Sequence, residues 1–348
     1  MKKTLSIVAL LFCVVVSLNA RTQEEAAALA GAFFGERVEQ GTAIPSLQRL
    51  SSAKKRPVNL AFTQVQADSI TPAVYVFNAL NNDGFVLISA KDEAKAILGY
   101  ADSGAFEQEN IPANMQFWLQ MYADELASVD KNKSGNSSVQ RIRLAEEENT
   151  YPAIEPILGN VKWNQDEPYN NLCPTINGEK SPTGCVATAV AQIMYKHQYP
   201  NKGTGSHSYV SRTYDLSLSA NFGNTTYDWA NMLPSYNESY TTTQANAVAT
   251  LLSHVGIAAE MDYGPQSSGA YSNDAMRALI EHFGYDKGIT TLKKDYMTEH
   301  YILTQIAVDL QEGRPVYIAG STMYEAGHAF VCDGMQSNGY VHINWGWN

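Results

Sequence analysis

The spacing of apolar residues indicates a small α+β unit in the first part of the chain. From Thr22 to Gln40, apolar residues recur every three or four positions, which is typical of an amphipathic helix. Apolar runs at 73–77 and 84–90 predict two strands. Asn81-Asn82-Asp83-Gly84 separates them, and its residues accept the positive φ of a hairpin turn. Further strands are expected at 58–62 and 96–100, and a helix at 112–129.

The second part of the chain follows a polar break. Residues 130–150 combine Lys-Asn-Lys-Ser-Gly-Asn-Ser-Ser with three consecutive glutamates, so we expect a flexible, protease-sensitive linker there. Beyond it the pattern predicts helices first and strands afterwards. The expected helices are 185–199, 241–255, 272–283 (capped by Ser272 or Asn273) and 301–311, and the expected strands are 316–319, 328–333 and 340–345.

The N-terminus indicates export. Lys2-Lys3 precede an apolar run that closes with Ala20, which is the arrangement of a secretory signal peptide and is shorter than a membrane-spanning helix needs. We therefore assign residues 1–20 to a signal peptide, 21–150 to a first domain that ends in the linker, and 151–348 to a second domain. The expected product is secreted or periplasmic, with no membrane span in its mature form.

Charge and cysteine usage narrow the classes of partner and cofactor. The net charge is −11 and no basic cluster stands out beyond Lys54-Lys55-Arg56, so nucleic acid is not an expected partner. Cys173, Cys185 and Cys332 remain after the signal peptide, and their spacing fits no zinc pattern. No metal or cofactor is predicted. Whether Cys173 and Cys332 pair is left open, and a buried free thiol is the default expectation.

Cys185 is the first candidate for chemistry. It follows Pro182 and Gly184, which a helix start tolerates, and begins the predicted helix. The positive end of the helix macrodipole favours the thiolate, which is the nucleophilic form of cysteine. A buried structural cysteine is the simpler interpretation of this residue taken alone, because free cysteines are usually buried.

Residues elsewhere in the chain favour the chemical interpretation. His328 begins an apolar strand and could act as the base that a cysteine nucleophile requires. Asn344 could orient the imidazole from the next strand, and Trp345 could shield that hydrogen bond from water. Gln165 could donate an N–H to an oxyanion together with the backbone N–H of Cys185. Glutamine, cysteine, histidine and asparagine follow the order used by papain-like hydrolases.

The motifs around these residues resemble those of the streptopain-type cysteine peptidases. The similarity lies in Trp163-Asn164-Gln165, Thr183-Gly184-Cys185-Val186-Ala187, Met261-Asp262-Tyr263-Gly264-Pro265, Gly327-His328-Ala329-Phe330-Val331 and Asn344-Trp345-Gly346-Trp347. Tyr75-Val76-Phe77-Asn78 and residues 84–90 resemble the family's pro-domain. The resemblance implies an α+β protein whose papain-like catalytic domain follows a small α+β pro-domain. That pro-domain would be the chain's own intramolecular inhibitor until the linker is cut.

The resemblance also implies a function and its residues. The chain would be a secreted cysteine endopeptidase made as a zymogen, without a cofactor, acting on polypeptides with a hydrophobic residue at P2. Cys185 would be the nucleophile and His328 the base and acid, with Gln165 in the oxyanion hole. Asn344 and Trp345 would support the imidazole. The implied substrate-binding residues are Gly264, Ser268, Gly269 and Gly327.

One departure from the family leaves two alternatives open. The chain stops at Asn348, where family members continue with a glycine-rich loop and more strand, so we expect a truncated catalytic domain. An inactive papain-fold module that binds peptides or inhibits a protease is the first alternative. A transglutaminase-like enzyme that uses the same thiol and imidazole for acyl transfer to amines is the second.

Overall fold

The computed structural model describes residues 21–39, 61–66, 72–92, 94–108, 150–321 and 327–347, with isolated residues between 111 and 126. The chain divides into two compact units: residues 1–111 with 118–138, and residues 112–117 with 139–348. The predicted signal peptide and most of the predicted linker lie outside the described residues. None of the helices in the described part of the chain has the length and apolarity of a membrane span.

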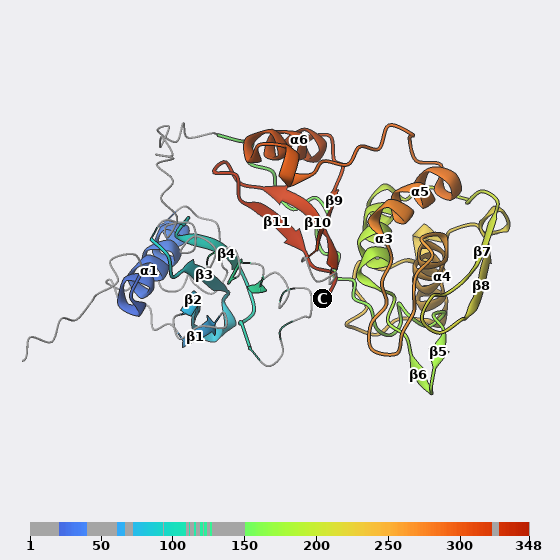
Figure 1. Ribbon diagram of the computed structural model, residues 1–348, viewed down its shortest axis with the longest axis horizontal. Coiled ribbons are helices and arrows are strands. Elements are labelled where there is room, and N and C mark those ends of the chain that lie inside the picture. The colour runs from blue at the N-terminus through green and yellow to red at the C-terminus, as the bar shows by residue number, and fades with distance from the viewer. Residues whose placement is uncertain are drawn as a thin grey trace, which may run out of the picture. The chain divides into compact units, whose positions relative to one another are not determined.

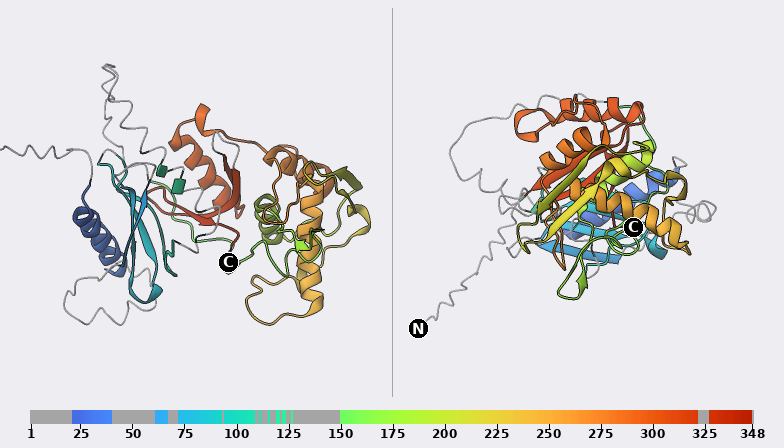
Figure 2. Two further views of the ribbon diagram at one scale, coloured as in Figure 1. Left: turned by 60° about the horizontal axis from the view of Figure 1, so that its bottom comes forward. Right: turned by 90° about the vertical axis from the view of Figure 1, so that its right-hand side faces the viewer.

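The first unit is a four-stranded antiparallel sheet with one helix on a face, as Figure 2 shows. Its elements are α1 (Gln23–Glu39), β1 (Ala61–Gln66), β2 (Pro72–Asn78), the 3-10 turn η2 (Leu80–Asn82), β3 (Phe85–Ser89) and β4 (Ile97–Ala101). The predicted hairpin is confirmed, because Asn78 pairs with Phe85 across the turn and Gly84 has φ +107°. Helix α1 buries Ala26, Ala30 and Phe34 against the sheet.

Two predicted elements lie only partly within the described residues. The first strand begins at Ala61, and positions 58–60 of the prediction lie outside the described residues. The predicted helix 112–129 is described only in part. Its described members Leu119, Ala123 and Leu126 are helical and buried.

The second unit combines helices with a three-stranded antiparallel sheet. Its larger elements are α3 (Cys185–His197), α4 (Thr242–Ala258), α5 (Ser272–Phe283), α6 (Glu299–Gln311), β9 (Val316–Ser321), β10 (Gly327–Met335) and β11 (Val341–Asn344). Its smaller elements are the hairpins β5 (Thr175–Ile176) with β6 (Glu179–Lys180) and β7 (Ser206–Val210) with β8 (Ser217–Asn221), and the 3-10 turns η3 (Phe222–Asn224), η4 (Trp229–Asn231) and η5 (Lys294–Tyr296). The strand order is β11-β10-β9.

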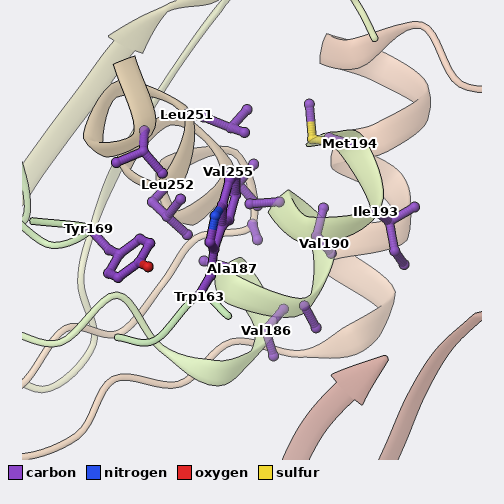
Figure 3. Packing of buried hydrophobic residues seen from close by; sticks show 14 of the residues in the cluster. Trp163, Tyr169, Val186, Ala187, Val190, Ile193, Met194, Leu251, Leu252 and Val255 are labelled. Atoms are coloured by element: carbon purple, nitrogen blue, oxygen red, sulfur yellow. The ribbon is translucent and has the colours of Figure 1, made fainter. Parts of the chain in front are cut away.

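Helix α3 lies between α4 and the sheet. Figure 3 shows its apolar residues beside Trp163 and beside side chains of α4, and Trp163 is fully buried. The sheet turns Ala329 and Val331 toward this cluster, whereas Cys332 belongs to a second cluster that includes side chains of α6. Because successive strand residues point to opposite faces, α3 and α6 cover opposite sides of β10, as Figure 1 shows.

Helix ends follow local signals in two cases and depart from them in a third. Thr241 caps α4 through a reciprocal capping box with Gln244, and Thr298 caps α6, which begins before the expected Tyr301. Helix α5 has the predicted bounds, but the predicted cap is wrong. Tyr271 is the N-cap residue and makes no side-chain cap, whereas the hydroxyl of Ser272 contacts a strand.

Candidate active site

Gly184 sets the position of Cys185 at the start of α3. It precedes the helix with φ +86° and ψ 140°, a conformation that only glycine adopts readily. A Cβ atom built on Gly184 would lie 2.7 Å from the sulfur of Met261 and 2.9 Å from the carbonyl oxygen of Ser268. Both backbone strain and close packing therefore require glycine next to the thiol.

Hydrogen bonds fix the same turn from inside the protein. Thr188 donates from its N–H and from its Oγ1 to the Gly184 carbonyl, at 3.0 and 3.1 Å, and its hydroxyl lies 2.8 Å from that of Thr183. The N–H of Thr183 donates to the carbonyl of Gln165 at 3.0 Å. Gln165 is buried, so the structure brings the predicted oxyanion-hole glutamine to the cysteine turn.

Strand β10 reaches the thiol through its backbone. The N–H of Ala329 donates to Sγ of Cys185 at 3.4 Å. The ladder between β10 and β11 begins only at Val331, whereas His328 and Ala329 pair with β9. His328, half-buried, is therefore the direct neighbour of the residue that contacts the sulfur. The structure thus brings the predicted nucleophile and the strand of the predicted base together.

Burial is the main influence on the pKa of the Cys185 thiol and of the His328 imidazole. It raises the pKa of the Cys185 thiol, and the N–H groups of Ala329, Val186 and Cys185 itself only partly offset this effect. The N–H groups of Val186 and Cys185 at the helix start favour the thiolate, as predicted, but desolvation penalises the charged sulfur more. Burial also lowers the pKa of the His328 imidazole. A thiolate–imidazolium pair must therefore be stabilised by the mutual attraction of its two charges.

The Asn344 segment packs against α3. Its Nδ2 donates to the carbonyl of Val161 at 2.8 Å, and its Oδ1 accepts from the N–H of Gly346 at 3.0 Å. Gly346 has φ +72°, and a Cβ there would lie 3.0 Å from Cγ2 of Thr188, one turn after the nucleophile. The amide thus holds its own turn beside the helix, and its role in orienting the imidazole stays a prediction.

Trp345 lies next to the base strand. Its ring centroid is 4.9 Å from that of Phe330, two residues beyond His328 on the same face of β10. The indole therefore packs along the strand of the predicted base, and its role in excluding water from the imidazole stays a prediction.

Three predicted substrate-binding residues share one loop beside the cysteine turn. The Ser268 hydroxyl donates to the Pro182 carbonyl at 2.7 Å, and the N–H of Gly264 donates to Oγ of Ser268 at 3.5 Å. Gly269 pairs with Asp262 through two backbone hydrogen bonds. Gly327, the fourth, is exposed at the start of β10. Their contact with substrate stays a prediction.

Some contacts at the site could not be predicted from the sequence, because they are made by backbone atoms or by residues that no sequence pattern distinguishes. The backbone N–H of Ala329 is invisible in a residue pattern. Met261 packs on Gly184, but nothing in its motif indicates a contact with that residue. Tyr317 of β9 has no distinguishing spacing, yet burial and the nearby Cys185 charge both raise the pKa of its phenol.

The remaining cysteines are poor nucleophiles. Cys173 and Cys332 are buried and free, as expected by default. Burial raises the pKa of each thiol to about 12, so both stay protonated at neutral pH. Among the described residues, no group of three or more His, Cys, Asp or Glu side chains is placed to hold a metal ion.

Both parts of the chain are similar to known protein families. Residues 163–348 match the model of the peptidase C10 family, and residues 19–126 match that of the Spi protease inhibitor. Streptopain of Streptococcus pyogenes is 33% identical over 295 residues, which cover 79% of this chain and 71% of streptopain. The thiol protease/hemagglutinin PrtT of Porphyromonas gingivalis is 32% identical over 310 residues, covering 85% of this chain and 35% of PrtT.

Two solved structures are also similar. A fragment of prointerpain A from Prevotella intermedia superposes with a TM-score of 0.70 at 34% identity, covering 83% of this chain and 89% of that chain. Active interpain A from the same organism gives a TM-score of 0.53 at 40% identity, covering 57% and 84%.

Proposed function

Because the chain belongs to the peptidase C10 family of cysteine peptidases, we propose that Cys185 is its nucleophile and His328 its general base and acid. The papain-like α+β fold, the peptidase activity and the inhibitor-like propeptide region predicted from the sequence are confirmed. The observation that carries the two assignments is the hydrogen bond from Ala329 to Cys185, because it brings the histidine strand to the start of α3.

The reaction begins with proton transfer from Cys185 to His328. The thiolate attacks the peptide carbonyl carbon, a C–S bond forms, and the carbonyl π electrons move to oxygen. The imidazolium then donates its proton to the leaving nitrogen as the C–N bond breaks, which leaves a thioester on Cys185. His328 next removes a proton from water, the water oxygen attacks the thioester, and the thiolate departs from the acid product.

Gln165 and the N–H of Cys185 are proposed to stabilise the oxyanion. The carbonyl of Gln165 is tied to Thr183, so its side chain starts from a fixed point beside the nucleophile. Donors that are already in place when charge develops are worth more than donors that must reorganise. Asn344 and Trp345 are proposed to support and shield the imidazole, and the packing of Trp345 on Phe330 favours that assignment.

The proposed substrates are polypeptides with a hydrophobic residue at P2. Gly264, Ser268 and Gly269 would line one side of the substrate path, and Gly327 the other. The contact of Ser268 with the carbonyl of Pro182 supports this, because it places the loop next to the cysteine turn.

Residues 21–150 are proposed to act as the intramolecular inhibitor, removed by cleavage within 130–150. The match of residues 19–126 to a protease inhibitor family supports this role. Export, with residues 1–20 as the signal peptide, completes the proposal and is supported by the charge and apolar pattern of that segment. Such a zymogen would be secreted or periplasmic.

Replacing Cys185 tests the proposal. Cys185→Ala should abolish both self-processing of the full chain in reducing buffer and hydrolysis of casein, read by mass, N-terminal sequencing and peptide release. Cys173→Ala is the matched control, because it removes a buried free thiol that has no part in the proposed reaction, and it should keep both activities. Hydrolysis that persists undiminished in Cys185→Ala would refute the assignment.

A further inference from the structure

The two proposed reacting groups come from parts of the second unit that are far apart in sequence. Cys185 belongs to the helical half, which comprises α3, α4 and α5, and His328 belongs to the sheet half, which comprises α6 and β9–β11. Catalysis is sensitive to their alignment, since a misplacement of about 1 Å can lower a rate by about 100-fold. Contacts that join the halves beside the thiol are therefore candidates for positioning residues.

A pair of hydroxyl groups joins the two halves close to Cys185. Ser272 is the first residue of α5, and its Oγ lies 2.9 Å from the hydroxyl oxygen of Tyr317 on β9. Tyr317 pairs with Val331 of β10 and packs against the core cluster that contains α3. Burial raises the pKa of this phenol, the hydrogen bond with Ser272 lowers it, and the charge of Cys185 raises it further. The phenol therefore lies within electrostatic reach of the thiol.

This hydroxyl pair completes a closed path of contacts around the thiol. On the helical side, Ser268 donates to the carbonyl of Pro182, just before the nucleophile, and its chain continues into Ser272. On the sheet side, β9 pairs with β10 through Ala329, whose N–H donates to Cys185. Apolar packing alone is non-directional, whereas a hydrogen bond fixes a distance and an angle. The hydroxyl pair can therefore set how α5 and β9 meet.

We propose that the Ser272–Tyr317 hydrogen bond holds the sheet half in register with the helical half, so that His328 stays aligned with Cys185. Both residues are positioning residues, because they act through α5 and β9 rather than on the reacting atoms. This inference rests on the proposed roles of Cys185 and His328 and names what keeps them together. Removing either hydroxyl breaks the same bond and leaves the other without its partner.

The test compares Tyr317→Phe, Ser272→Ala and the double variant, each made as the full chain and then processed. We expect kcat per titrated thiol to fall about tenfold in each, with KM within about twofold and the double variant no slower than the singles, because all three lack one bond. We also expect a shift in the pH profile of the rate at which iodoacetamide alkylates Cys185. Its acid limb should move to higher pH, because a misaligned imidazolium stabilises the thiolate less.

Tyr227→Phe is the matched control. It removes a buried phenol hydroxyl that lies 3.0 Å from Nδ1 of His254, away from the sheet half. It should destabilise the fold while leaving kcat and the alkylation profile unchanged. Ser272→Ala removes a single oxygen atom and keeps the test open if Tyr317→Phe does not fold.

Two results would overturn the inference. One is that kcat and the alkylation profile stay unchanged in both Tyr317→Phe and Ser272→Ala. The other is that these two variants change kcat and the alkylation profile no more than Tyr227→Phe does. If the unaltered chain hydrolyses no peptide, the proposed function fails, but the alkylation profile of Cys185 still decides whether the hydroxyl pair aligns the thiol and the imidazole.

Discussion

Gly184→Ala should damage both the stability and the activity of the second unit. The backbone at Gly184 has φ +86° and ψ 140°, and holding alanine in such a region costs about 1–3 kcal/mol. The new Cβ would lie 2.7 Å from the Met261 sulfur and 2.9 Å from the Ser268 carbonyl oxygen, and overpacking of this kind adds about 1–3 kcal/mol. We therefore expect a loss of about 2–6 kcal/mol, a large fraction of the stability of a typical domain.

The assay separates the two contributions with a matched glycine. Gly178 has φ +87°, and nothing lies within 4 Å of its Cβ position, so Gly178→Ala carries backbone strain without the steric contact. Urea denaturation of both variants in a Cys185→Ala background avoids self-digestion. In the active background, Gly184→Ala should lower kcat by about 100-fold, because any shift of the turn moves the thiol and its N–H. Equal stability in the two variants, with full activity of Gly184→Ala, would refute the reasoning.

Three further predictions rest on separate contacts. Burial lowers the pKa of His254 from 6.5 to about 4, so about 3 kcal/mol of stability should be lost as the pH falls through that window. His254→Gln should flatten this loss in denaturation curves, and a curve parallel to that of the parent would contradict it. Thr241→Ala removes a capping box and should lower the unfolding free energy by about 1 kcal/mol in urea, with peptidase activity unchanged. Asn344→Ala removes the hydrogen-bond partners of the Val161 carbonyl and of the Gly346 N–H, so it should lower the unfolding free energy by about 1–3 kcal/mol. It should also lower kcat while changing KM less, and an unchanged kcat would contradict a role beside the imidazole.

The helices and strands were largely predictable because their signals are local. The helix that begins at Cys185 and the bounds 272–283 of α5 follow from apolar spacing and from the residues at the helix ends. The hairpin between β2 and β3 follows from its turn residues. The helix caps were less predictable. Serine is a common N-cap residue, but the hydroxyl of Ser272 makes a tertiary hydrogen bond with Tyr317 instead of capping α5.

The approach of Cys185 to the His328 strand was also predictable, whereas the effect of burial on the pKa of the thiol was not. Cys185 and the strand of His328 meet as their motifs imply. The N–H groups at the helix start lower the pKa of the thiol as predicted, but the sequence did not show that desolvation would outweigh them, because its extent depends on which segments cover the sulfur. Asn344 likewise makes contacts with Val161 and Gly346 that its motif did not indicate.

The sequence alone determined the elements, the candidate residues and the family, because helix period, turn chemistry and motif order are properties of short segments. The tertiary structure decided which backbone N–H reaches the sulfur, how far burial opposes its ionisation, and that Ser272 meets Tyr317. Each of these depends on the approach of segments far apart in the chain, and the distance and burial that result are set by packing, which no local pattern specifies.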